Sequence, residues 1–249
     1  MRVAVTTLGC KVNQYDTATI ESRLRHEGCE IVAFAPGADV YIVNSCTVTD
    51  RADAESRQLA RRARRFNSAA RVIMTGCFAQ VSPQRAAIAE VDHVVGLNRL
   101  ADLIRAVRGE LVAAERVLVD DLRAARSVRT LGAETFTGQT RAFLKVQEGC
   151  DLFCTFCVVP MARGRSRSVP PREVRAQLEM LAQRGFQEVV LTGVHLGGYG
   201  HDLEPVIDLC DLLEMLVEQS PVPRRRIRVK QTERCAWIFR FGRIVSGLA

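Results

Sequence analysis

Short runs of β-branched residues alternate with helical stretches along most of this chain, and that alternation limits the folds open to it. Parallel strands need a crossover connection, usually a helix, so the pattern predicts βαβ units and a mostly parallel sheet with helices on its faces. Any site should then lie at the carboxyl edge of the strands. In the first part of the chain we expect strands over residues 2–7, 30–34, 40–43, 72–75 and 93–95, and helices over 16–26, 52–65, 83–89 and 100–108.

A second series of the same kind follows a polar, arginine-rich stretch that has little sustained period and predicts a linker. Its expected strands span residues 142–147, 188–192 and 226–229, and its expected helices span 171–184 and 205–218. The sequence therefore predicts an α/β protein of two domains. The expected parts are an N-terminal domain over 1–112, a linker over 113–140, a second βα domain over 141–229 and a tail over 230–249.

Composition narrows the setting in which the chain works. No apolar run approaches the roughly 20 residues that span a bilayer, and no secretory signal opens the chain, so we expect a cytoplasmic protein without a membrane segment. Thiols stay reduced there, so clustering among the nine cysteines favours metal ligands or catalytic groups over disulfides. The net charge of +7 permits attraction to a polyanion such as RNA, although the arginine bias can also reflect codon composition.

The most specific motif is a CxxxCxxC run formed by Cys150, Cys154 and Cys157, directly after an expected strand. Three thiolates on one loop can ligate three irons of a four-iron, four-sulfur cube and leave the fourth iron free to bind a small molecule. A structural zinc site is the alternative, but zinc usually takes four protein ligands and no fourth Cys or His is evident nearby. The spacing favours the iron–sulfur cluster.

Three further cysteines, Cys10, Cys46 and Cys77, each follow a different expected strand of the N-terminal domain. Taken singly, each would more often be an inert buried residue. In a parallel sheet, however, the three strand exits share one edge, so the three thiols can converge on one site. Their joint placement therefore favours a second cluster.

With Phe156 before its last cysteine, the CxxxCxxC run resembles the signature of the radical S-adenosylmethionine (SAM) superfamily. The order of the two triplets resembles the methylthiotransferase family, in which an N-terminal three-cysteine domain carries an auxiliary cluster ahead of the radical SAM domain. The resemblance covers residues 1 to about 229. Blocks similar to the family's, in the family's order, stand at residues 7–15, 44–49, 75–80, 159–168 and 191–197.

The resemblance implies two 4Fe–4S clusters and SAM as cofactors, and it leaves the catalytic residues unassigned. It implies that Phe156 packs near the adenine of SAM, although an ordinary core aromatic is compatible with that position. Gly193 stands at an expected strand exit, where the lack of a side chain lets the backbone approach SAM. The implied metal ligands are Cys10, Cys46, Cys77, Cys150, Cys154 and Cys157.

Within the family, the sequences KVNQY after Cys10 and TGVHL at 192–196 are most similar to the branch that modifies N6-threonylcarbamoyladenosine beside the tRNA anticodon. The isopentenyladenosine branch usually differs at both places, and the branch that modifies a ribosomal aspartate typically has proline where this chain has Lys11. The implied reaction consumes two SAM molecules, one as methyl donor to sulfur and one as radical source, and places a methylthio group on carbon 2 of adenine. Radical chemistry suits a C–H bond of no useful acidity. The implied partners are the tRNA and an electron donor such as a flavodoxin or ferredoxin.

Four polar residues near these motifs have two interpretations each. Arg163, Arg165 and Arg167 could bind substrate phosphates or the cofactor carboxylate through bidentate contacts, or they could be solvated surface. His195 could face the cofactor pocket from a strand end, although a lone histidine is more often structural.

The chain also departs from its family. The family's radical SAM domain is a partial βα barrel of about six units, whereas residues 143–249 suffice for about three, so we expect an incomplete barrel. Residues 230–249 match no family block, which suggests a frameshifted or prematurely ended product of doubtful activity. Three alternatives stay open: a non-enzymatic iron–sulfur fragment, a methylthiotransferase for protein such as the ribosomal aspartate, and a zinc-binding RNA-associated module.

Overall fold

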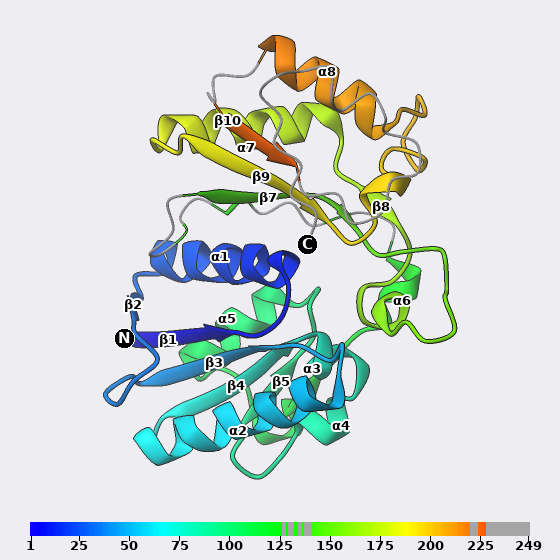
Figure 1. The fold of residues 1–249 in the computed structure, drawn as a ribbon. Coiled ribbons are helices and arrows are strands. Elements are labelled where there is room, and N and C mark those ends of the chain that lie inside the picture. Colours follow the sequence, from blue (N-terminus) through cyan, green and yellow to red (C-terminus); the bar gives the residue numbers. More distant parts are fainter. Residues whose placement is uncertain (126–127, 129–131, 134–135, 137–140, 220–223, 228–249) are drawn as a thin grey trace.

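The structure is a computed structural model, and it describes residues 1–125, 128, 132–133, 136, 141–219 and 224–227. Strands and helices alternate along it (Figure 1). The strands are β1 (Arg2–Thr7), β2 (Glu30–Val32), β3 (Val40–Ser45), β4 (Arg71–Gly76), β5 (His93–Val95), β6 (Val117–Leu118), β7 (Ala142–Glu148), β8 (Arg167–Ser168), β9 (Glu188–Gly193) and β10 (Arg224–Ile227). The α-helices are α1 (Lys11–His26), α2 (Asp50–Phe66), α3 (Cys77–Val81), α4 (Pro83–Ala86), α5 (Leu100–Arg108), α6 (Val159–Arg163), α7 (Pro171–Gln183) and α8 (Leu209–Gln219).

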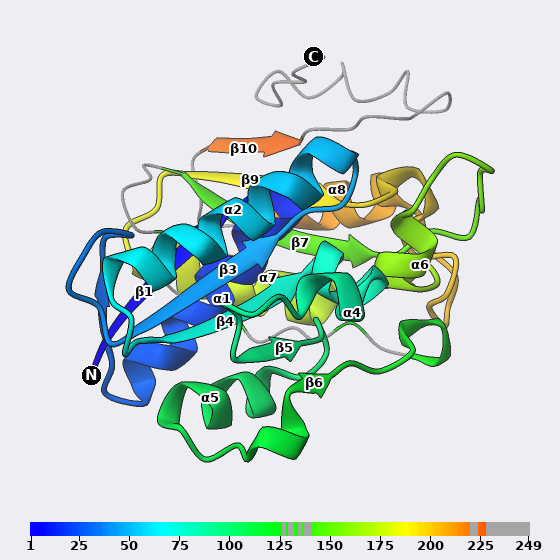
Figure 2. The same cartoon turned by 90° about the horizontal axis from the view of Figure 1, so that it is seen from below.

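The first sheet holds six strands in the order β2-β1-β3-β4-β5-β6, and every pairing in it is parallel (Figure 2). All six residues of β3 are buried, as expected for a central strand with helices on both faces. One face packs on α2, α3 and α4 through small and aromatic side chains such as Ala60, Ala63 and Phe78. The other face packs on α1 and α5, and two cores therefore sandwich this sheet.

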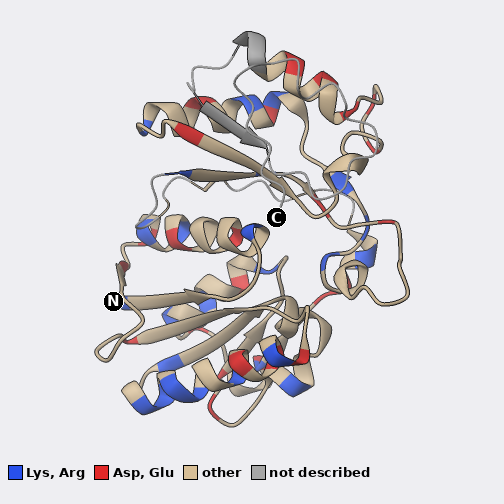
Figure 3. Cartoon of the chain, in the orientation of Figure 1, with Lys and Arg blue, Asp and Glu red and all other residues tan. Residues whose placement is uncertain are grey.

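Local sequence explains where the longest helix of this domain begins. The side chain of Thr49 accepts a hydrogen bond from the Ala52 amide at 3.2 Å, which caps the start of α2. Asp50 and Asp53 stand in the first turn, where negative charge favours the helix dipole. Arginines follow along α2, several of them exposed on the outside of the molecule (Figure 3).

The second sheet has the strand order β10-β9-β7-β8, with β10, β9 and β7 parallel and the short β8 antiparallel to β7. Helices α7 and α8 cover one face of it (Figure 1). They pack through leucines such as Leu178, Leu181 and Leu212. The sheet therefore has the helix-on-sheet packing of an α/β unit on that side.

Helix α1 lies between the two sheets and contacts both (Figure 1). Ile20 and Leu24 pack in the core beneath the first sheet, whereas Tyr15 and Ala18 join the core of the second. The ammonium group of Lys11 lies 4.5 Å from the centre of the Phe143 ring on β7. Helix α1 therefore covers the face of the second sheet that lies opposite α7 and α8.

These observations confirm the predicted α/β class, with a parallel N-terminal sheet followed by a second βα unit. Within the predicted linker over 113–140, β6 pairs with β5 at the edge of the first sheet and satisfies backbone groups there. The predicted tail over 230–249, and the end of the strand predicted over 226–229, lie outside the described residues. Within the described part of the chain, no helix is both long enough and apolar enough to cross a bilayer.

Candidate active site

The three cysteines of the N-terminal domain line one cavity of about 460 Å³. Cys10 directly precedes α1, Cys46 follows β3, and Cys77 is the first residue of α3, directly after β4. Strands β1, β3 and β4 are neighbours in parallel register, so their exits meet at one edge of the sheet. Cys46 and Cys77 are buried, whereas Cys10 is exposed.

Two glycines let the cysteine loops approach one another this closely. Gly9 has a φ of +95°, and a Cβ atom there would lie 2.8 Å from the sulfur of Cys46. Gly76 has a φ of +93°, and its Cβ would collide with the backbone of Ser45, including the amide nitrogen at 2.5 Å. Both conformations suit glycine alone, so the backbone itself keeps Cys10, Cys46 and Cys77 together.

Asn13, on the first turn of α1, contacts all three cysteine loops. Its side-chain nitrogen donates to the carbonyl oxygens of Leu8 at 2.8 Å and Ser45 at 3.0 Å, just ahead of Cys10 and Cys46. Its side-chain oxygen accepts from the Cys77 thiol at 3.7 Å. Sequence reasoning did not single out Asn13, and its place in the KVNQY block was the only available signal.

The second cysteine loop is more open. Cys150 is buried, Cys157 is half-buried and Cys154 is exposed. Phe153 has a φ of +46°, an uncommon left-handed conformation for a phenylalanine. Phe156 is 91% exposed, so the ordinary core aromatic is excluded as an interpretation of this residue.

Gln147, at the end of β7, connects this loop to the opposite strand exit. Its side-chain nitrogen donates to the carbonyl of Gly149 at 2.8 Å, and its side-chain oxygen accepts from the amide of His195 at 2.8 Å. Gly193 and His195 line the same cavity as the N-terminal cysteines, and His195 Nδ1 lies 3.9 Å from the sulfur of Cys150. Burial, with a smaller effect of His201, lowers the pKa of His195 and favours its neutral form. Gln147 was another residue that sequence reasoning missed.

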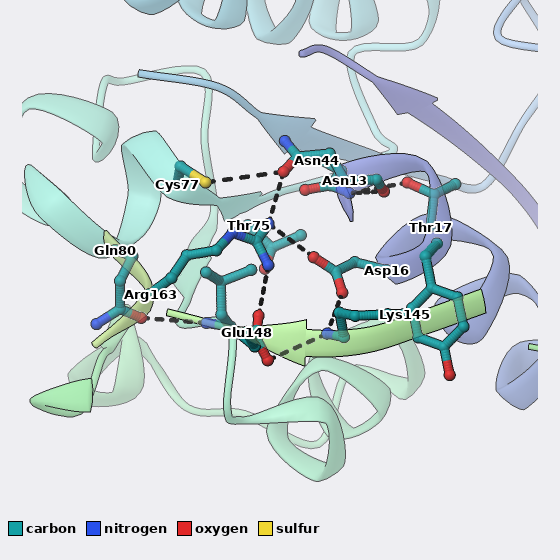
Figure 4. A network of polar contacts seen from close by, with 12 residues as sticks. Asn13, Asp16, Thr17, Asn44, Thr75, Cys77, Gln80, Lys145, Glu148 and Arg163 are labelled. Carbon is teal, nitrogen blue, oxygen red and sulfur yellow. Dashed lines mark hydrogen bonds and ion pairs between the residues drawn. The ribbon is translucent and has the colours of Figure 1, made fainter. Parts of the chain in front are cut away.

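At Arg163 the structure excludes the interpretation as solvated surface. This side chain is only 3% exposed and binds Asp16 through Nη2 at 2.8 Å and Glu148 through Nη1 at 2.5 Å (Figure 4). Lys145 Nζ binds the same two carboxylates, at 2.8 and 3.1 Å. Arg163 is therefore not solvated surface, and both of its terminal nitrogens already bind protein oxygens. Arg165 is exposed, while Arg167 is buried and donates to the carbonyl oxygen of Arg163 at 2.5 Å.

The electrostatics of this network follow from its opposite charges. Burial alone would raise the pKa of Glu148, but Lys145 and Arg163 outweigh that effect and lower the pKa to about 2. Burial alone would lower the pKa of Lys145, yet Asp16 and Glu148 hold it above its usual range. Burial raises the pKa of the Cys77 thiol, and the Arg163 guanidinium offsets part of the rise.

The donor set fits an iron–sulfur cluster on the N-terminal side of the cavity. Within the described residues, no group of three or more His, Cys, Asp or Glu side chains is placed to hold a metal ion. A four-iron cube is wider than one ion, and it takes three thiolates that surround a space. Cys10, Cys46 and Cys77 line such a space, and the Arg163 guanidinium partly offsets the rise that burial causes in the pKa of the Cys77 thiol.

Two family models match the chain in the order of its two sheets. The model of the uncharacterized protein family UPF0004 matches residues 2–96, and that of the radical SAM superfamily matches residues 144–230. The class is therefore a radical SAM protein with an N-terminal three-cysteine domain. The superfamily uses a 4Fe–4S cluster and SAM, and the CxxxCxxC loop of Cys150, Cys154 and Cys157 lies within the matched residues.

Named relatives narrow the class. The chain is 46% identical to the threonylcarbamoyladenosine tRNA methylthiotransferase MtaB of Aquifex aeolicus over 81% of this chain and 50% of that protein. It is 45% identical to the enzyme of the same name from Bacillus subtilis, over 81% of this chain and 45% of that protein. The chain belongs to the radical SAM methylthiotransferase family and is most similar to its threonylcarbamoyladenosine branch, as the sequence predicted.

A relative from another branch is less similar. The tRNA-2-methylthio-N(6)-dimethylallyladenosine synthase of Fervidobacterium nodosum is 29% identical over 90% of this chain and 51% of that protein. The chain spans about half the length of the curated relatives it matches. Among solved structures, the radical SAM methyltransferase TsrM of Kitasatospora setae aligns with a TM-score of 0.61 at 17% identity, over 92% of this chain and 56% of that chain. That likeness supports the fold.

Proposed function

We propose that this protein transfers a methylthio group to carbon 2 of N6-threonylcarbamoyladenosine in tRNA. The observation that carries the proposal is the cavity between the two sheets, with three N-terminal thiols on one wall and the radical SAM residues Gly193 and His195 on the other. A cavity of about 460 Å³ is in the size range of small-molecule sites. The names of the relatives support the substrate.

Each triplet has its own part in this proposal. Cys10, Cys46 and Cys77 hold an auxiliary 4Fe–4S cluster, and the CxxxCxxC loop holds the cluster that binds SAM. When bound, these groups supply the methylthio sulfur and the radical that removes hydrogen from the adenine. The chain's own residues bind and orient: Gly193 leaves room for SAM at a strand exit, and His195 packs against Cys150 as a neutral imidazole.

The proposed partners are the tRNA and a one-electron donor such as a flavodoxin or ferredoxin, which places the reaction in the cytoplasm. Exposure of Cys154 and Phe156 supports electron entry at the CxxxCxxC loop, because it keeps that cluster site near the surface. The proposed domains are those expected from the sequence: residues 1–112 for the auxiliary cluster, 113–140 between the domains, and 141–229 for SAM.

Anaerobic reconstitution of the full chain with iron and sulfide tests the proposal. We expect two clusters per chain, formation of 5′-deoxyadenosine from SAM after reduction, and methylthiolation of tRNA from cells that lack the gene. Mass spectrometry of tRNA nucleosides measures the last step, and wild-type tRNA, which already carries the group, is the matched control.

The outcomes separate the alternatives. Two clusters without SAM cleavage would identify a non-enzymatic iron–sulfur protein, and zinc without iron would identify the zinc-binding module. SAM cleavage with modification of a ribosomal protein instead of tRNA would identify a protein methylthiotransferase. Each of these results contradicts the proposed function.

A further inference from the structure

We propose that Arg163 is a positioning residue that fixes the wall bearing Cys10, Cys46 and Cys77 relative to the radical SAM wall of the cavity. It does so through a closed ring of four buried ion pairs that joins α1 to β7 and α6, and through Asn13. The inference rests on the proposed function only for its effect on turnover, because the contacts themselves belong to the described structure.

The ring consists of Asp16 on α1, Lys145 and Glu148 on β7, and Arg163 at the end of α6. Each carboxylate binds both cations and each cation binds both carboxylates, at distances from 2.5 to 3.1 Å (Figure 4). The four side chains are 3–15% exposed. Two positive and two negative charges balance, so every member depends on the others for compensation of its buried charge.

The ring joins elements that are far apart in the sequence. Asp16 is the N-terminal domain's only member, and it stands 129 residues from Lys145 and 147 residues from Arg163. Helix α1, which carries Asp16, also packs its Tyr15 and Ala18 in the core of the second sheet. Apolar packing gives this interface its area, whereas paired charges specify one register between its sides, because a shifted register leaves charges buried without partners.

Arg163 also connects the ring to the cysteines, through its hydrogen bond with Asn13. Its Nη2 also donates to the side-chain oxygen of Asn13 at 2.6 Å, and the same oxygen accepts from the Cys77 thiol at 3.7 Å. Asn13 holds the loops before Cys10 and Cys46 through its nitrogen. The Arg163 guanidinium therefore contacts both Asp16, which binds α1 to the ring, and Asn13, which contacts the three cysteine loops. Arg163 also lines the cavity.

The test uses the full chain with Asp16→Asn and Arg163→Gln combined. This double variant removes one acid and one base, so the remaining Lys145–Glu148 pair stays balanced and folding escapes the penalty of a lone buried charge. We expect hydrogen exchange of the α1 and β7 amides to quicken about tenfold or more, while β3 and β4 exchange as in the wild type. Arg123→Gln, which removes the exposed pair with Asp121, is the control and should change neither region.

Unchanged exchange at α1 and β7 would overturn the proposal, and so would equal acceleration in β3 and β4, which would mean general destabilisation.

A second measurement uses the reconstituted double variant. We expect it to keep both clusters and SAM cleavage but to lose about tenfold or more in methylthio transfer, because only the geometry between the walls has changed. Full transfer would also overturn the inference. If the wild type cleaves no SAM, the proposed function fails while the exchange result still decides the role of the ring.

Asn13→Leu tests the link to the cysteines, since leucine has a similar size but lacks both polar atoms. We expect this variant to lose the iron of one cluster after reconstitution while it retains the iron held by the CxxxCxxC loop. Retention of all iron would contradict the role of Asn13 as the contact between the three loops.

Discussion

The two cysteine sites of this protein are built in opposite ways. Cys10, Cys46 and Cys77 come from three separate strand exits, with two of the three residues buried and the loops gathered by Asn13 and two glycines. Cys150, Cys154 and Cys157 lie within eight consecutive residues, and part of their loop is exposed. The first site is a product of tertiary packing, whereas the second is a product of local spacing.

The difference teaches where each site should be vulnerable. A site assembled from distant strands fails when the packing that gathers its ligands is disturbed. A site on one loop fails chiefly when a ligand is removed, because its spacing is encoded locally. Substitutions at ligands, glycines and ring members therefore distinguish the two sites.

The largest expected effect comes from removing one ligand from each site. Cys150→Ala should abolish SAM cleavage, whereas Cys10→Ala should leave SAM cleavage intact and abolish only methylthio transfer. Each variant should lose about half of the iron bound by the wild type, because a cluster with two thiolates is poorly held. Iron content and 5′-deoxyadenosine formation measure the two effects. Loss of SAM cleavage as well as methylthio transfer in Cys10→Ala would show that the two cysteine sites do not act separately.

A smaller effect is expected from Gly76→Ala, which should destabilise the chain by about 4 kcal/mol through backbone strain and overpacking together. The added methyl group would meet the backbone of Ser45, next to Cys46. Gly28→Ala is the matched control, because Gly28 also has a positive φ of +78° but has no atom within 4 Å of the added carbon. Urea unfolding gives both free energies. Equal losses would show that strain alone, without the collision, accounts for the effect.

Glu148→Gln should destabilise the apo chain by about 3 kcal/mol near neutral pH, because it breaks a buried ion-paired network. The pKa of Glu148 in the folded state is about 2, below its ordinary value of 4.5, so its stabilising effect is complete above pH 4.5 and is lost as the pH falls toward 2. Stability measured by urea unfolding from pH 7 to pH 3 should therefore fall less steeply in the variant. Identical acid slopes in both proteins would contradict this assignment.

The smallest expected effect is that of Tyr15→Phe. The Tyr15 hydroxyl donates to the side-chain oxygen of Gln177 at 3.0 Å, across the interface between α1 and α7. Its loss should cost about 1 kcal/mol, since Gln177 is left with an unsatisfied buried oxygen. Thermal unfolding of the apo chain measures it, and iron loading should stay as in the wild type. A loss of the N-terminal cluster would mean that this site depends on the interface more widely than the ring implies.

Sequence reasoning recovered the elements whose signals are local. Strands β1 and β5 and helix α5 agree with their predicted bounds, because their apolar periods and flanking turns lie within a few residues. It missed α3 and α6, which are five residues long and give no periodic pattern. Both begin or end at site residues, Cys77 and Arg163, so short elements that lack a period carry part of the site.

The sequence by itself determined the alternation of strands and helices, the grouping of the cysteines into two triplets and the family, because each of these is written in residues close together or in a fixed order. Only the tertiary structure decided which polar residues serve those triplets. Asn13 and Arg163 are 150 residues apart, and their contact at 2.6 Å exists only because α1 lies between two sheets. Side chains that pair over such separations leave no local pattern, so burial and distance in the folded chain were needed to assign them.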